Sequence, residues 1–440
     1  MSNLIPSQTG LTLRRTDTLI NLTNKLLAKT GVKGISEMSD DELWEWWLGV
    51  SDEWKFLLLR CGLELELWES NEWQFGKNYN YQAEFDWFNR ELIFAYLKEL
   101  QKLRELDLFE SQTQNIEPLA TLTQLNKLDL YDNQIQNISV ITCLKQLTNL
   151  NLGNNQIQDI SAIANLIKLK KLNLSHNQIQ DISVLQNLMS IKHLDLCGNQ
   201  VQDISILSNF LNLTELNLGF NQVQDFSVFS SLTKLTSLGL MFCKIKDISI
   251  LKGLVQLTNL VLRGNEIQDI SVISNLKRLT TLNLEANKIK DISMLANLNK
   301  LTNLSLSFND INDFSVLTNL TKLTYLDLSG TNFQDIYVLS ELKELRNLQL
   351  QFNDIRDISD IFHFAQLNKL DLSHNQIQDI SVLANLTQLT TLWLGGNQIK
   401  NISVLANLKQ LKYLNLSENP IHPQDIDWLK QQLPNCEIDF

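Results

Sequence analysis

Residues 150–171 read LNLGNNQIQDISAIANLIKLKK, and this 22-residue unit recurs along most of the chain. The Leu-x-Leu pair that opens it, Leu150 and Leu152, returns at every step of 22 from Leu106 to Leu416. Fifteen copies therefore follow one another without an insertion or a deletion. A fixed period of this length indicates a solenoid, in which each copy packs on the next.

The leucines of each copy predict a short strand. Leu128 and Leu130 alternate with Lys127, Asp129 and Tyr131, which is the period of a strand with one buried face. Stacked copies would form a parallel sheet whose inward leucines make one long core. Parallel strands need a crossover, and the rest of each copy supplies it.

An asparagine three residues after the second leucine predicts a hydrogen-bonded ladder. Buried backbone groups of the turn need partners, and an amide both donates and accepts. Ser111, Cys243 and Thr331 replace it in three copies and keep some hydrogen-bonding ability, so we interpret Cys243 as structural. The other twelve copies carry Asn133, Asn155, Asn177, Asn199, Asn221, Asn265, Asn287, Asn309, Asn353, Asn375, Asn397 and Asn419.

Four residues after the ladder position stands Asp or Asn, and Ser follows two residues later in most copies, as in Asp159 and Ser161. Both residue types cap helical turns, which predicts a short helical or 3₁₀ turn in each copy. Eleven copies, from Asp159 to Asp379, carry the acid. A cation-binding stripe is the alternative, but capping already uses each carboxylate.

Each copy reads approximately Leu-x-x-Leu-x-Leu-x-x-Asn-Gln-Ile-Gln-Asp-Ile-Ser-x-Leu-x-Asn-Leu. This pattern resembles leucine-rich repeats of the 22-residue class, found in bacterial internalins and in a phosphatase regulatory subunit. The resemblance covers about three quarters of the chain. It implies an α/β solenoid: a right-handed curved array with one short parallel strand per repeat on the concave side and 3₁₀ or helical turns on the convex side.

The two ends depart from the repeat, which predicts three parts. Residues 1–96 form a helical, tryptophan-rich domain, 97–421 the solenoid and 422–440 a C-terminal cap. In the first part we expect helices over 16–29, over 51–62 and over about 84–96, and another that begins at the capping box Ser39-Asp40-Asp41-Glu42. In the last part we expect a helix over 424–433 and a strand over 437–440. The N-terminal domain is either a large cap or a docking module of its own.

Composition limits the classes of partner and the compartment that we expect for this protein. The net charge of −12 disfavours nucleic acid and anionic membrane as partners. Five scattered cysteines without a Cys-x-x-Cys pair argue against zinc and disulfides and suit a reducing compartment. With no leader or membrane span visible, we expect a cytoplasmic protein.

Motifs for chemistry are missing from the sequence. There is no phosphate-binding loop, no Rossmann glycine pattern and no His-Glu-x-x-His, and the five histidines are scattered. Acids between the two leucines of a Leu-x-Leu pair, such as Asp107 and Asp371, have no base or nucleophile recurring beside them. We therefore expect no enzyme, no cofactor and no metal.

Departures from the consensus mark the candidate binding residues. Most concave positions carry small polar residues, whereas some carry the aromatic, Met and Arg types that are enriched where partners bind. For Phe220 and Phe242 the alternative is that they fill gaps beside the ladder. The candidates are Phe220, Met241, Phe242, Val261, Arg263, Tyr325, Trp393 and Tyr413.

The functional prediction is a bacterial-type interaction scaffold that binds a partner protein on its concave sheet face. It rests on analogy of fold, because leucine-rich repeats host many functions. Alternatives are a regulatory or targeting subunit of an enzyme and an internalin-like, host-directed adhesion factor. The sequence carries no signal for the identity of the partner or for the oligomeric state.

Overall fold

The computed structural model describes residues 34–63 and 90–440. The chain divides into two compact units, unit 1 from Met1 to Asn212 and unit 2 from Leu213 to Phe440. The helix expected over 16–29 and the start of the one expected at residue 84 lie outside the described residues.

Unit 1 begins with helices: η1 (Ile35–Glu37), α2 (Asp40–Gly49), α3 (Asp52–Leu63) and α5 (Arg90–Leu100). Ser39 and Glu42 form the predicted capping box at the start of α2, and α3 confirms the helix expected over 51–62. α5 continues beyond residue 96 to Leu100, so the first residues expected in the solenoid are helical.

These helices pack on the first repeat. The indole N–H of Trp54, which is 4% exposed, donates to the carbonyl oxygen of Asn115 at 3.0 Å. The Gln101 amide donates to the carbonyls of Ile35 and Met38 at 2.9 and 3.1 Å. The helical region therefore contacts the first repeat of unit 1.

The repeats of unit 1 contribute five parallel strands, paired in chain order. Each pairs leucine with leucine across one repeat, as in Leu128 with Leu150. The strands are β1 (Glu105–Asp107), β2 (Lys127–Asp129), β3 (Asn149–Asn151), β4 (Lys171–Asn173) and β5 (His193–Asp195).

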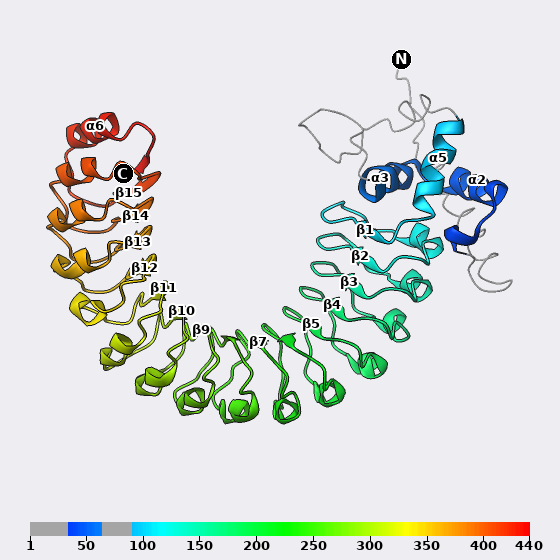
Figure 1. The fold of residues 1–440 in the computed structure, drawn as a ribbon, viewed down its shortest axis with the longest axis horizontal. Coiled ribbons are helices and arrows are strands. Elements are labelled where there is room, and N and C mark those ends of the chain that lie inside the picture. Colours follow the sequence, from blue (N-terminus) through cyan, green and yellow to red (C-terminus); the bar gives the residue numbers. More distant parts are fainter. Residues whose placement is uncertain (1–33, 64–89) are drawn as a thin grey trace, which may run out of the picture. The chain divides into compact units, whose positions relative to one another are not determined.

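Unit 2 continues the pattern, and its strands line the inner side of its curve (Figure 1). Helix α6 (Pro423–Gln432) and the last strand close the unit, which confirms the helix and strand expected there. The strands are β6 (Glu215–Asn217), β7 (Ser237–Gly239), β8 (Asn259–Val261), β9 (Thr281–Asn283), β10 (Asn303–Ser305), β11 (Tyr325–Asp327), β12 (Asn347–Gln349), β13 (Lys369–Asp371), β14 (Thr391–Trp393), β15 (Tyr413–Asn415) and β16 (Glu437–Asp439).

A 3₁₀ turn follows each strand from β1 to β14 on the opposite side of the repeat (Figure 1). In unit 1 these are η2 (Glu117–Thr121), η3 (Ser139–Cys143), η4 (Ser161–Ile163), η5 (Ser183–Asn187) and η6 (Ser205–Asn209). In unit 2 they are η7 (Ser227–Ser230), η8 (Ser249–Gly253), η9 (Ser271–Asn275), η10 (Ser293–Asn297), η11 (Ser315–Asn319), η12 (Ile336–Leu339), η13 (Ser359–His363), η14 (Ser381–Asn385) and η15 (Ser403–Asn407).

The core of each unit lies between the strands and the 3₁₀ turns. The paired leucines of the strands are at most 3% exposed, and the Ile and Leu side chains of the turns are buried against them. The predicted fold class, a solenoid with one short parallel strand and one 3₁₀ turn per repeat after N-terminal helices, is confirmed.

Candidate partner-binding site

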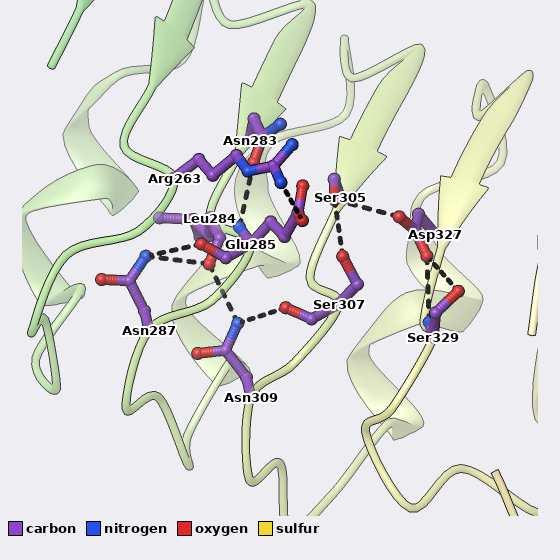
Figure 2. A network of polar contacts seen from close by, with 10 residues as sticks. All are labelled: Arg263, Asn283, Leu284, Glu285, Asn287, Ser305, Ser307, Asn309, Asp327 and Ser329. Atoms are coloured by element: carbon purple, nitrogen blue, oxygen red, sulfur yellow. Dashed lines mark hydrogen bonds and ion pairs between the residues drawn. The ribbon is translucent and has the colours of Figure 1, made fainter. Parts of the chain in front are cut away.

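Ladder asparagines hold the turn that follows each strand. Asn309, which is 4% exposed, donates from Nδ2 to the carbonyl oxygens of Leu284, Leu306 and Ser307 at 2.9, 2.9 and 3.3 Å. Its Oδ1 accepts the backbone N–H of Ile289 at 3.0 Å. Figure 2 shows how Asn287 and Asn309 both reach the same carbonyl of Leu284. One amide thus links two neighbouring repeats.

The three copies without a ladder asparagine have a different turn. The hydroxyls of Ser111 and Thr331 donate to one carbonyl within their own repeat, each at 2.6 Å. The Cys243 thiol lies 3.4 Å from the carbonyl oxygen of Leu218. The residue after each of the three is left-handed, with φ of 55° at Gln112, 57° at Lys244 and 61° at Asn332. Loss of the amide is therefore accompanied by a second left-handed residue in the turn.

The residue before the ladder position is left-handed in all fifteen copies, with φ between 50° and 69°. Gly, Asn and Asp adopt this conformation at little cost, and several copies carry them. Four copies instead carry phenylalanine: Phe220, Phe242, Phe308 and Phe352. Each of these rings is 40–51% exposed, so it combines an unfavourable backbone with limited burial.

These turns also pair rings with glycines of the next repeat. A Cβ added to Gly264 would meet the Phe242 ring at 2.4 Å, and one on Gly330 would meet Phe308 at 2.8 Å. His176 over Gly198 and His374 over Gly396 repeat the arrangement at 2.6 and 2.5 Å. The signal for it in the sequence is a ring-then-Gly pair recurring every 66 residues, which the 22-residue period hides.

The structure brings five of the eight candidate residues into one stretch of neighbouring repeats. The rings of Phe220 and Phe242 stack at 4.7 Å between centroids, and the Arg263 guanidinium lies 5.8 Å from the Phe242 ring. Met241 and Val261 are half-buried on the adjacent turn and strand. Phe242 therefore covers Gly264 and still exposes 40% of its surface.

Acidic groups border this stretch (Figure 2). Arg263 forms an ion pair with Glu285 at 3.1 Å. Burial raises the pKa of Glu285, and the Arg263 charge opposes that shift. Tyr325 lies further along unit 2, where burial and the charges of Asp327 and Glu285 raise its pKa to about 12. Its hydroxyl is therefore a hydrogen-bond donor at neutral pH.

Trp393 and Tyr413 form a second, separate pair near the C-terminal end. Their ring centroids are 5.9 Å apart, and the Tyr413 hydroxyl donates to the carboxylate of Asp439 in β16 at 2.5 Å. This hydrogen bond raises the pKa of Tyr413. The pair thus anchors the last strand as well as facing solvent.

Acids between the two leucines of a Leu-x-Leu pair have a structural role that the sequence did not reveal. Their carboxylates accept the backbone N–H two residues later: Asp327 from Ser329 and Asp371 from Ser373, both at 2.9 Å. Asp371 is 7% exposed, and burial raises its pKa.

The aspartates before the 3₁₀ turns are bonded in the same manner. Ser161 donates its N–H to Asp159 at 2.8 Å, and this bond lowers the pKa of Asp159. Asp181, Asp203, Asp247, Asp291 and Asp379 behave alike. Capping thus accounts for these carboxylates, and no group of three or more metal-ligating side chains occurs among the described residues.

Comparison with known families and structures shows which family of repeats this chain contains. A family described as leucine-rich repeats in two copies matches residues 123–165, 145–188, 167–209, 211–253, 255–297 and 387–431, and two further leucine-rich repeat families match 343–399 and 319–336. An internalin (inlF) from Listeria monocytogenes is 36% identical, with a TM-score of 0.57, over 72% of this chain and 88% of that one. This chain belongs to the internalin-like class of leucine-rich repeat proteins.

Other solved structures share the fold of this internalin-like protein. A leucine-rich repeat protein of Leptospira interrogans is 27% identical, with a TM-score of 0.64, over 78% of this chain and 98% of that one. The ectodomain of a plant receptor kinase from Arabidopsis thaliana, at 22% identity and a TM-score of 0.54, covers 78% of this chain and 47% of its own, and supports the fold alone. No curated protein matches the sequence. Within the described residues, no helix is both long and apolar enough to cross a membrane.

Proposed function

We propose that this internalin-like protein is an interaction protein that binds a partner protein through Phe220, Met241, Phe242, Val261 and Arg263, here called the aromatic cluster. Leucine-rich repeat proteins commonly serve protein–protein interaction, and the internalin-like relatives share that architecture. The observation that carries the proposal is a pair of stacked, exposed phenylalanines in left-handed turns.

The energetics of these turns favour a binding role. A side chain with a Cβ costs roughly 1–2 kcal/mol in the left-handed region, and a stacked ring pair returns about 0.5–1.5 kcal/mol. Asn154 and Gly198 occupy the same position in other repeats and avoid the cost. Exposed rings beside a Met and an Arg match the residue types enriched where partners bind.

Two further expectations remain proposals. The similarity to an internalin favours a host-directed adhesion factor as the second candidate function. A cytoplasmic site of action is supported by free thiols at Cys143, Cys243 and Cys436, because a reducing compartment preserves them. We favour the cytoplasmic interaction protein.

Affinity capture with the full chain tests the aromatic cluster. The variant Phe220→Asn/Phe242→Asn removes both rings and places in the turns a residue that Asn154 already shows to fit. Ala286→Asn is the matched control, since Ala286 holds the same turn position without a ring. We expect the control to retain a partner that the double variant loses by ten-fold or more. Equal capture by a folded double variant would refute the proposal.

A further inference from the structure

A tight turn precedes each strand at the edge where the chain enters the sheet. In three copies of unit 1 its closing hydrogen bond runs from Leu147 to Leu144, from Leu169 to Leu166 and from Ile191 to Leu188, at 3.0–3.1 Å. The two central residues of each turn face solvent. At the first of these two positions most other copies hold polar residues such as Lys145 or Thr321, and Val255 and Ala365 are isolated exceptions.

Three successive turns break this rule with large aliphatic side chains. Ile167, Met189 and Leu211 occupy the first central position in consecutive repeats and are 60%, 49% and 58% exposed. Single exposed apolar residues are ordinary, but a contiguous row is a feature of interaction sites. Because neighbouring strands lie about 4.8 Å apart, the row is roughly 10 Å long.

The same turns are basic in a chain whose net charge is −12. Residues 143–149, 165–171, 187–193 and 209–212 contain no aspartate or glutamate. All of their lysines are exposed. They are Lys145, Lys168, Lys170, Lys171 and Lys192.

We propose that Ile167, Met189 and Leu211 with the surrounding lysines, here called the basic edge, dock an acidic amphipathic helix of a partner protein. Residues three or four apart on a helix are about 5–6 Å apart, which matches the spacing of the aliphatic row. The apolar face of such a helix would cover the row while its carboxylates meet the lysines. This surface lies within unit 1 and shares no residue with the aromatic cluster, so the two proposals stand independently.

Charge complementarity favours this occupant over a lipid surface. The basic edge combines lysines with a row of aliphatic side chains, whereas matching turns of unit 2 carry lysines such as Lys300 and Lys322 without such a row. The chain as a whole, with a net charge of −12, would be repelled by an extended anionic bilayer. A single acidic helix meets the lysines without approaching the acidic remainder. An anionic membrane is therefore the alternative outcome of the test.

Fluorescence anisotropy on the full chain tests the proposal with a defined probe. The probe is a labelled helical peptide of about 18 residues with leucines at helical spacing on one face and glutamates on the other. A scrambled peptide of equal composition and vesicles of phosphatidylcholine with phosphatidylserine are the comparison ligands. We expect binding of the amphipathic peptide alone, weakened by salt because exposed charges are screened.

Two variants locate the binding. Ile167→Ser/Met189→Ser/Leu211→Ser and Lys168→Glu/Lys170→Glu should each weaken binding of the peptide ten-fold or more. Their controls in unit 2 are Val255→Ser, at the turn position of Ile167, and Lys300→Glu/Lys322→Glu, both at the turn position of Lys168, and they should leave binding unchanged. Unfolding midpoints of the exposed variants should equal that of the parent chain. Binding by vesicles alone, equal binding of the scrambled peptide, or an unaltered affinity in the triple variant would overturn the proposal.

Discussion

Replacing ladder asparagines one at a time should give unequal losses of stability, because their neighbours differ. In Asn309→Ala the N–H of Ile289 loses its acceptor and the carbonyl of Leu306 loses its donor. The carbonyl of Leu284 keeps the Asn287 amide, and that of Ser307 keeps the Ala286 N–H. Two buried groups are therefore left without the partners that the structure gives them.

In Asn287→Ala only one buried group is orphaned, the N–H of Ile267. The carbonyls of Leu262, Leu284 and Glu285 each retain another donor, from Asn265, Asn309 and the Gly264 N–H respectively. The difference arises because Thr331, one repeat after Asn309, donates to Leu328 and does not reach back to Leu306.

Each orphaned buried group costs about 1–3 kcal/mol, so we expect losses of roughly 2–6 kcal/mol for Asn309→Ala and about half of that for Asn287→Ala. Urea unfolding followed by circular dichroism measures both, and the exposed Asn312→Ala should stay within about 0.5 kcal/mol of the parent. Thr331→Asn should instead stabilise by about 1 kcal/mol, since it restores the missing donor. Equal midpoints for Asn309→Ala and Asn312→Ala would show that the ladder bonds contribute nothing net.

Three other changes test separate parts of the molecule. Gly264→Ala should lower the free energy of unfolding by about 2–3 kcal/mol in chemical denaturation, because φ is 69° there and the new Cβ would meet Phe242. The control Gly253→Ala should be neutral or stabilising, because nothing lies within 4 Å of a Cβ at that position. Burial raises the pKa of Cys243 to about 11, so at pH 8 native Cys243 should react with iodoacetamide roughly 200-fold more slowly than the unfolded chain in urea. The contribution of this thiol to stability should fall as the pH rises above about 8.5 towards 11. Equal reaction rates in the native and unfolded chain would contradict the buried thiol. Trp54→Phe should cost about 1–2 kcal/mol and speed hydrogen exchange in the first repeat, and unchanged exchange there would argue against a capping role for the N-terminal helices.

The sequence could predict the elements that depend on local pattern. Strand and 3₁₀ turn follow from the alternation around Leu128 and from the Asp159-x-Ser161 spacing, and both recur often enough to exclude chance. The capping box at Ser39 is equally local. Contacts that join distant residues could not be predicted this way: Tyr413 donates to Asp439, which lies in the cap after a helix that breaks the repeat. The positive φ of Phe220 could not be predicted either, because phenylalanine is not a residue type that favours this conformation.

The two turns of each repeat connect the fold with both proposals. The residue before the ladder position is left-handed in every copy whichever side chain it carries, so its identity is free to vary without changing the fold. A ring there is accommodated where the next repeat supplies Gly264, Gly330 or Gly396, since a Cβ would collide with it. The tight turns at the opposite edge are closed by backbone hydrogen bonds and likewise require no particular side chain at Ile167 or Met189. Departures from the consensus at positions that the fold leaves open are therefore the places where this repeat protein can encode its partners.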